Sequence, residues 1–191
     1  ALDAALDEVA AGGRVGLDRA GRRDVVGRDR VPDRDETAGA ADVVDEPLTI
    51  ARQMGADETI NVATDNSWVS RYAADKGTFD VLLECSGNQR ALRDGMETMR
   101  PRGVIVQLGL GGDVSISQNM VVAKELDIRG SFRFHAEFAL AVQIINQRRI
   151  DFSPVITRSF SMQQANDAFA LASDRKRAMK VLIDFADVAT A

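Results

Sequence analysis

Short apolar runs and amphipathic segments alternate along most of this chain, from about residue 45 onward. Residues 79–85, FDVLLEC, are almost continuously apolar, as are residues 104–108. Runs of this length are typical of parallel strands that are covered by helices on both faces. Helical spacing of apolar residues predicts helices over 45–55, 66–76, 89–99, 118–124 and 136–146.

This regular alternation predicts the fold class. Further strands are expected at 59–62 and 126–134, and short glycine-containing turns separate the elements. We therefore expect an α/β fold with a doubly wound, Rossmann-like parallel sheet. After Asp151 the pattern changes to a strand, a helix and a strand, expected at 155–160, 162–172 and 179–185.

Residues 11–44 break the pattern, because Arg and Asp interrupt every apolar run before it reaches the length of a buried strand. No G-x-G-x-x-G turn is present there, so the doubly wound sheet is expected to be incomplete. One interpretation is a charge-rich linker. The other is a local frameshift, since GC-rich DNA read out of frame yields mostly Gly, Ala, Arg, Asp, Val and Pro. Recognisable sequence on both sides favours the frameshift.

Composition narrows the choice of partners and compartment. A net charge of -5 argues against nucleic acid as the main partner, because phosphate binding needs a basic surface. No uninterrupted apolar stretch approaches the roughly 18 residues of a membrane span, and the acidic start ALDAALDEVAAGG does not resemble a secretory signal. A single cysteine fits a reducing compartment, and a cytoplasmic location is expected.

Candidate metal and acid–base chemistry is sparse. The chain has one cysteine and one histidine, Cys85 and His135, on different expected elements. Zinc needs three or four converging ligands, so no zinc site is expected in this chain. Cys85 is expected to be a small core residue at the end of a buried strand, and His135 to have a capping or surface role. No residue is assigned a catalytic role.

The glycines after two expected strands carry more information. Ser86–Gly87 and Gly109–Gly112 follow strands directly, and open α/β sheets bind ligands at the carboxyl ends of their strands. The alternative is that they are ordinary tight turns. Asp42 stands where an acidic residue would bind a ribose hydroxyl, or is simply a surface residue. Arg133 could meet a phosphate or substrate oxygen, or form a surface ion pair.

Several segments together resemble one family: DEPLTIARQMGADETINV, FDVLLECSGN, MRPRGVIVQLGLGG, KELDIRGSFRFHAEFALAV and ANDAFALASDRKRAMKVLIDF. They are similar to medium-chain, zinc-dependent alcohol and polyol dehydrogenases, in order and with natural spacing over about residues 42–186. The resemblance implies that NAD(P) oxidises a secondary alcohol of a sugar acid or polyol, while zinc polarises the alcohol. The zinc ligands would lie in a catalytic domain preceding residue 1.

The resemblance also implies a domain organisation. Residues 1–10 would be the remnant of a linking helix, 11–44 the disrupted segment, and 45–150 the incomplete cofactor domain. Residues 151–186 would return to the catalytic domain, and 187–191 would form a tail. The function expected is the cofactor-binding half of a dehydrogenase, inactive as this chain. The alternative is a non-catalytic remnant or a domain that pairs subunits.

The family's cofactor contacts carry over as expectations. NAD is expected rather than NADP, because no arginine immediately follows Asp42. Strand 126–134 is expected at a sheet edge that pairs two subunits, giving a homo-oligomer, and the partner of the site is a small-molecule substrate rather than nucleic acid or a membrane. The expected cofactor-binding residues are Asp42, Cys85, Ser86, Leu108, Gly109, Leu110, Ser131, Phe132 and Arg133.

Overall fold

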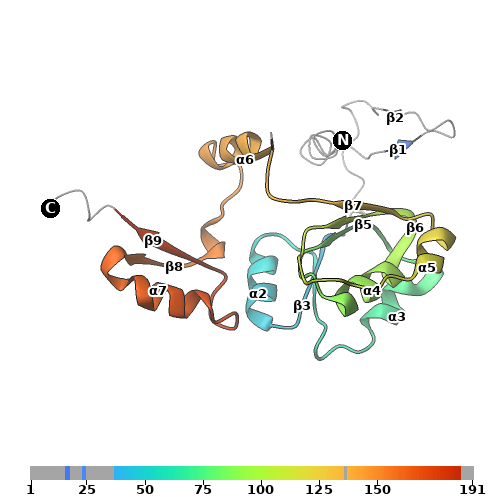
Figure 1. Cartoon of the computed structure of the whole chain (residues 1–191), viewed down its shortest axis with the longest axis horizontal. Helices are drawn as coiled ribbons and strands as arrows, with labels where there is room; N and C mark the ends of the chain where they lie inside the picture. The colour runs from blue at the N-terminus through green and yellow to red at the C-terminus, as the bar shows by residue number, and fades with distance from the viewer. Residues whose placement is uncertain (1–15, 18–22, 25–36, 136, 186–191) are drawn as a thin grey trace. The chain divides into compact units, whose positions relative to one another are not determined.

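The computed structural model describes residues 16–17, 23–24, 37–135 and 137–185 (Figure 1). Contacts divide the chain into two compact units, Val62–Arg133 and a second unit of Ala1–Asn61 with Phe134–Ala191. The expectations for residues 1–10 and 187–191, and most of those for 11–44, fall outside the described residues. The expected domain limits remain predictions. No described helix has both the length and the apolar character to cross a membrane.

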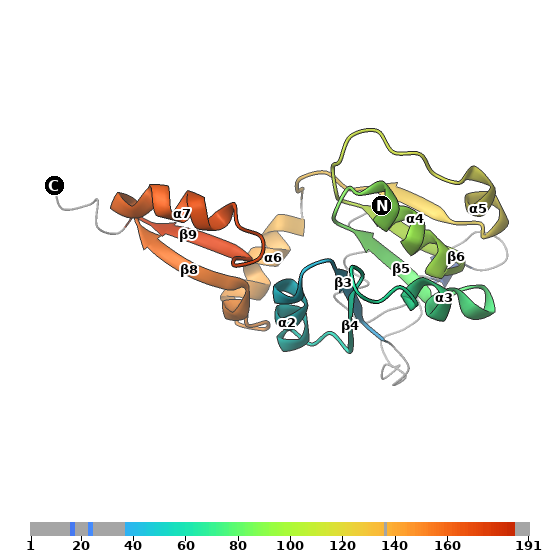
Figure 2. The same cartoon turned by 90° about the horizontal axis from the view of Figure 1, so that it is seen from below.

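The unit Val62–Arg133 is built on a three-stranded parallel sheet of order β5-β6-β7. Its strands are β5 (Phe79–Glu84), β6 (Met99–Gln107) and β7 (Asp127–Gly130). Its helices are α3 (Trp68–Ala73), the 3₁₀ turn η1 (Ala74–Lys76), α4 (Gln89–Thr98) and α5 (Gln118–Ala123). Figure 2 shows β5 and β6 of this sheet beside the helix α4. The predicted alternation of strands and helices is therefore confirmed.

One face of this sheet carries the core. Ile105 of β6 is completely buried together with Met99, and Leu92 and Met96 of α4 pack against them. Leu82 of β5 joins them because alternate residues of a strand point to the same face. This burial fixes α4 on the sheet and so fixes the turn that precedes the helix.

The opposite face differs from the expectation. The continuous apolar run of β5 predicts burial on both faces, yet Val81 and Leu83 are 56% and 62% exposed. These residues share the face opposite Leu82, and within the part of the chain that the structure describes they are not buried. The position of the strand is correctly predicted, and only the predicted burial of its second face is wrong.

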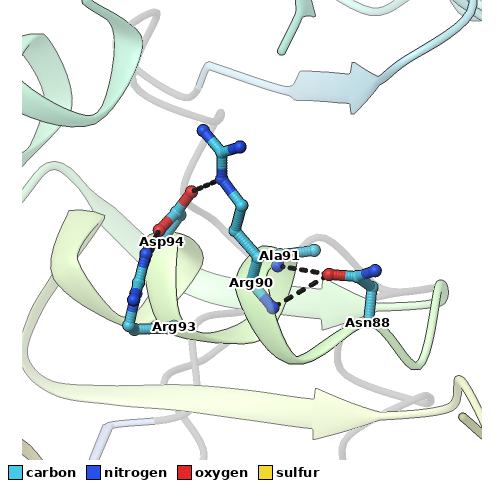
Figure 3. Close-up of polar contacts among 5 residues, drawn as sticks. All are labelled: Asn88, Arg90, Ala91, Arg93 and Asp94. Atoms are coloured by element: carbon cyan, nitrogen blue, oxygen red, sulfur yellow. Dashed lines mark hydrogen bonds and ion pairs between the residues drawn. The ribbon is translucent and has the colours of Figure 1, made fainter. Parts of the chain in front are cut away.

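Polar contacts define both ends of α4, and Figure 3 shows those of Asn88, Arg90, Ala91, Arg93 and Asp94. The side-chain oxygen of Asn88 accepts the N–H groups of Arg90 and Ala91 at 2.9 and 3.3 Å, and so caps the first turn. The buried carboxylate of Asp94 accepts from both Arg90 and Arg93. At the other end, the Lys124 ammonium donates to the carbonyls of Met96, Glu97 and Met99 at 3.3, 2.6 and 2.8 Å.

Among its described residues, the second unit contains two parallel strand pairs and one short antiparallel pair. The four-residue strands β3 (Gly39–Asp42) and β4 (Glu58–Asn61) pair in parallel, with α2 (Asp45–Gln53) between them in the chain. A short antiparallel pair consists of β1 (Gly16–Leu17) and β2 (Arg23–Asp24). The remaining elements are α6 (Glu137–Asn146), η2 (Ser153–Val155), β8 (Ile156–Ser161), η3 (Met162–Gln164), α7 (Ala165–Ala172) and β9 (Lys180–Asp184).

Most of these elements agree with the sequence. The strands β8 and β9 pair in parallel with α7 between them in the chain, which confirms the predicted C-terminal strand–helix–strand. The short strands β1, β2 and β3 lie within residues 11–44, where no buried strand is expected. The residues of β3 are exposed or half-buried, so β3 pairs through its backbone without becoming a buried strand.

Two boundaries also differ. β7 ends at Gly130, so the last part of the expected strand 126–134 lies beyond the strand. The N-cap of α2 is Val44, which makes no side-chain capping hydrogen bond and donates its backbone N–H to Asp42 at 3.0 Å. Asp42 therefore forms a short turn with Val44 directly before the helix.

Replacement of Lys124 by methionine tests how α4 is held. Lys124→Met keeps the apolar stem but leaves the carbonyls of Met96, Glu97 and Met99 without their ammonium donor. We expect a loss of about 1–3 kcal/mol in the free energy of unfolding, the usual effect of removing a hydrogen bond to a charged group. Urea unfolding measures it. The same change at exposed Lys176 should cost less than about 0.5 kcal/mol, and equal losses would contradict the capping role.

Candidate site at the carboxyl ends of β5, β6 and β7

Three strand ends meet at one edge of the unit Val62–Arg133. Because β5, β6 and β7 are parallel, their last residues, Glu84, Gln107 and Gly130, lie at the same edge. Glu84 is paired in register with Gln107, and Gln107 with Gly130. The loops that leave these strands are therefore neighbours, which is the position where open α/β sheets bind ligands.

The carboxylate of Glu84 lies beneath these loops. Glu84 is 4% exposed and accepts the N–H groups of Ser86 and Gly87 at 2.8 and 2.9 Å. It also accepts from the Ser86 hydroxyl and from the side-chain amide of Gln107. Burial disfavours the charged form, but these hydrogen bonds outweigh burial and lower the pKa of Glu84. The side chain is therefore a carboxylate at neutral pH.

Backbone contacts join the same loops. Leu108 and Gly109 both donate their N–H groups to the carbonyl of Glu84, at 2.8 and 2.9 Å. Ser131, directly after β7, donates its N–H to the carbonyl of Gln107 at 3.0 Å. The Gln107 amide also donates to the Gly109 carbonyl at 3.0 Å. Each loop at this edge is thus tied to the neighbouring strand.

The glycines of this edge lie backbone against backbone. A Cβ added to Gly109 would fall 2.0 Å from the Gly87 nitrogen, and one added to Gly111 would fall 1.9 Å from the Gly87 oxygen. Gly87 also has a φ of +68°, in the left-handed region that favours glycine. Close approach of two loops therefore requires these glycines, which goes beyond their role in ordinary tight turns.

Most of the expected cofactor residues come together at this edge. Cys85 and Ser86 follow β5, Leu108, Gly109 and Leu110 follow β6, and Ser131, Phe132 and Arg133 follow β7. Leu108, Leu110 and Phe132 are exposed, while Gly109 and Ser131 are half-buried. Asp42 stands at the end of β3 in the other unit, half-buried. The structure therefore brings eight of the nine predicted residues to one edge. Their role in binding remains a prediction.

Cys85 corrects one expectation. Its side chain is exposed rather than part of the core, because it shares the uncovered face with Val81 and Leu83. Partial burial and the charge of Glu84 raise the pKa of the Cys85 thiol. The thiol is therefore protonated at neutral pH, which suits a contact surface better than a nucleophile.

The other two singled-out residues lie on the surface. The guanidinium of Arg133 stacks over the ring of Phe132 at 4.9 Å, and Arg133 has a positive φ of 59°. The ion pair considered as its alternative role is thus replaced by a cation–π contact. His135 is exposed and donates its backbone N–H to the Glu137 carboxylate at 2.7 Å, so its expected surface position is confirmed.

The residues present do not fit a zinc site. Within residues 37–135 and 137–185 and the two short strands before them, no three His, Cys, Asp or Glu side chains are grouped so that they could hold a metal ion. A dinucleotide fits better, because the edge offers a glycine-lined backbone surface and exposed apolar side chains.

Glu84 and Gln107 were not identified from the sequence as site residues. Glu84 ends the apolar run FDVLLE, and Gln107 ends the run VIVQ, so each is a polar residue at the last position of a strand. A carboxylate at such a position must find hydrogen-bond donors when it is buried. That signal was available, but only the register of β5 with β6 shows that the two side chains meet.

Comparison with known proteins assigns the class. Residues 37–147 match the zinc-binding dehydrogenase family, so the chain belongs to that family. Its members are dehydrogenases and therefore oxidoreductases, as the sequence predicts.

Individual relatives refine this picture. The chain is 34% identical over 156 residues to L-idonate 5-dehydrogenase (NAD(P)(+)) of Escherichia coli, covering 78% of this chain and 45% of the relative. It is 32% identical to D-xylulose reductase of Saccharomyces cerevisiae, covering 69% of this chain and 40% of the relative. The crystal structure of the E. coli L-idonate 5-dehydrogenase superimposes with a TM-score of 0.73 at 33% identity, over 78% of this chain and 43% of that one. The chain thus spans less than half the length of these relatives.

The contact between the glycines gives a direct test. Gly109→Ala places a methyl group against the backbone of Gly87, so the two loops must separate. We expect a loss of about 1–3 kcal/mol or more in the free energy of unfolding, as for other overpacked sites, together with shifts of the Gly87 and Gly111 amide resonances.

Gly130→Ala is the matched control. A Cβ at Gly130 meets nothing within 4 Å, so the free energy of unfolding of this variant should lie within about 0.5 kcal/mol of that of the parent. Tolerance of alanine at Gly109 would show that the loops are not held in contact.

Proposed function

We propose that this chain is the cofactor-binding part of an NAD(P)-dependent dehydrogenase that oxidises a secondary alcohol of a sugar acid or polyol. The edge where β5, β6 and β7 end carries the proposal, because it joins a glycine-lined surface to family membership. Similarity to L-idonate 5-dehydrogenase and D-xylulose reductase supports a polyhydroxylated substrate. In such a reaction the nicotinamide accepts a hydride from the alcohol carbon.

The residues of this chain would hold and orient the dinucleotide. Ser86 and Cys85 would contact one end of it, and Leu108 to Leu110 with Ser131 to Arg133 would line the nicotinamide side. Asp42 would accept a hydrogen bond from a ribose hydroxyl, and its negative charge disfavours a ribose phosphate, so NAD is preferred to NADP. The zinc of the family would polarise the alcohol oxygen, and its ligands are not among the described residues of this chain.

A second candidate is a non-catalytic domain that pairs subunits. One observation from the sequence favours it: no G-x-G-x-x-G turn is present to bind the pyrophosphate at a helix N-terminus. Such a chain would keep the fold of residues 62–133 while binding dinucleotide weakly. The measurement below separates the two functions.

Titration of the purified chain with NADH and NADPH by calorimetry tests cofactor binding. We expect saturable binding, weaker than in enzymes with a complete pyrophosphate turn, with NADH preferred. Asp42→Ala should reduce that preference, because the repulsion of the additional phosphate is lost. No L-idonate or sorbitol turnover is expected from the chain supplied with zinc and NAD, since the described residues hold no group of side chains that could bind the metal ion. Absence of saturable binding would favour the pairing domain, and turnover would contradict the assignment of a cofactor-binding part alone.

We further propose that the chain forms a homo-oligomer through β7. In the sheet order, β7 is an end strand, and Ile128 is 39% exposed. An end strand offers backbone donors and acceptors to a second strand, and a two-fold axis would place β7 beside its own copy.

Ile128→Pro tests this arrangement because proline removes a backbone donor at the centre of the strand. Sedimentation velocity should show self-association of the parent chain and its loss in the variant. Val122→Ser is the control, because it is a polar change at an exposed position of α5, away from β7. It should leave self-association unchanged. A monomeric parent, or association that survives Ile128→Pro, would contradict pairing through β7.

A further inference from the structure

Glu84 is a buried carboxylate to which the proposed function gives no role. Its two oxygens face donors on both sides: Oε1 accepts from the backbone and hydroxyl of Ser86, and Oε2 accepts from Gly87 and from the Gln107 amide. Ser86 and Gly87 belong to the turn after β5, whereas Gln107 ends β6. One side chain therefore joins both loops of the site.

Only an ionised carboxylate satisfies this set of donors. A glutamine at position 84 would bring one oxygen and one NH₂ group, and the NH₂ group would face either the turn or the Gln107 amide, which are donors themselves. Reversal of the Gln107 amide would restore the contact with position 84. It would then turn an oxygen towards the Gly109 carbonyl, which now accepts from Gln107. An amide at position 84 cannot keep both loops in place.

The same network fixes what Ser86 can offer. Because ionised Glu84 has no proton, the Ser86 hydroxyl must donate to it, and the Asn88 N–H donates to the Ser86 oxygen at 3.1 Å. The exposed Ser86 side chain is left with a lone pair for a ligand. It therefore presents an acceptor, suited to a hydroxyl or amino group of a nucleoside.

We propose that Glu84 is a positioning residue: its carboxylate holds the turn after β5 and the loop after β6 as one surface and orients the Ser86 hydroxyl as an acceptor for the dinucleotide. The proposal rests on the proposed function for its ligand. The junction itself involves only residues of this chain, so the two proposals can fail separately.

The sign of the pH dependence follows from the same contacts. Hydrogen bonds lower the pKa of Glu84 in the folded chain below its ordinary value of 4.5. The carboxylate therefore stabilises the loops above pH 4.5, and this contribution is lost as the pH falls through the lower folded pKa. The titratable group next in sequence is the thiol of Cys85, whose raised pKa keeps it neutral in this range.

The experiment compares the chain with Glu84→Gln by amide hydrogen exchange and by NADH calorimetry. We expect the Ser86 and Gly87 amides to exchange faster in the variant, while that of Ile105, in the centre of β6, is unchanged. NADH should bind about tenfold more weakly or worse, the effect of losing one hydrogen bond to a charged group. The Gly87 amide shift should titrate below pH 4.5 in the parent and stay flat in Glu84→Gln.

Asp94→Asn is the matched control, since it makes the same chemical change at a buried carboxylate of α4. It should lower stability without altering the Ser86 and Gly87 amides or the NADH affinity. If Glu84→Gln does not fold, Gln107→Met is the second variant. It removes the amide that donates to Glu84 and to the Gly109 carbonyl. The loop at Gly109 should then loosen, while the Gly87 amide, which donates to Glu84, stays protected from exchange.

Three results would overturn the proposal: unprotected Gly87 in the parent, an unchanged NADH affinity in Glu84→Gln when Gly87 is released, or equal effects of Asp94→Asn. A parent chain that binds no NADH but shows the expected exchange and titration would contradict the proposed function. In that result the role of Glu84 in joining the loops would still be supported.

Discussion

Parallel pairing of β5 with β6 is the constraint on which the rest of the unit Val62–Arg133 depends. Registered pairing places Glu84 beside Gln107, so the two polar side chains meet at the strand ends. The same pairing puts Leu82 and Ile105 on the face covered by α4. Burial of this face is the main stabilising contribution, since each large apolar side chain removed from water contributes about 1.5–3 kcal/mol. The site is therefore positioned by the same contacts that stabilise the fold.

The helix α4 holds the turn that precedes it, at the edge of the sheet, in place. Asn88 caps its first turn, directly after the loop that Glu84 holds, and Lys124 binds its last carbonyls. A helix fixed at both ends leaves the preceding turn little freedom. This explains how a turn of only a few residues, Cys85 to Asn88, is held at the edge of the sheet.

Sequence patterns predict the strands and helices of this unit well, because apolar spacing directly reflects which residues face the core. The apolar run of β5 and the glycines after β6 both lie where expected. Burial of Cys85, Val81 and Leu83 could not be predicted reliably, since it depends on what covers the second face of the sheet. The strand β3 has no apolar run that would predict it, because it pairs with β4 through its backbone and its side chains are not buried.

The contact among Gly87, Gly109 and Gly111 limits how this site can change during evolution. At each of these glycines, backbone atoms of the facing loop, and not a side chain, occupy the space that a Cβ would need. A side chain gained at one position cannot be accommodated by making a neighbouring side chain smaller, because the atoms that it would meet belong to the backbone. Compensation would need a loop of different length. Substitutions at the three positions are therefore closed to ordinary second-site suppression, whereas insertions or deletions in the loop after β6 remain open.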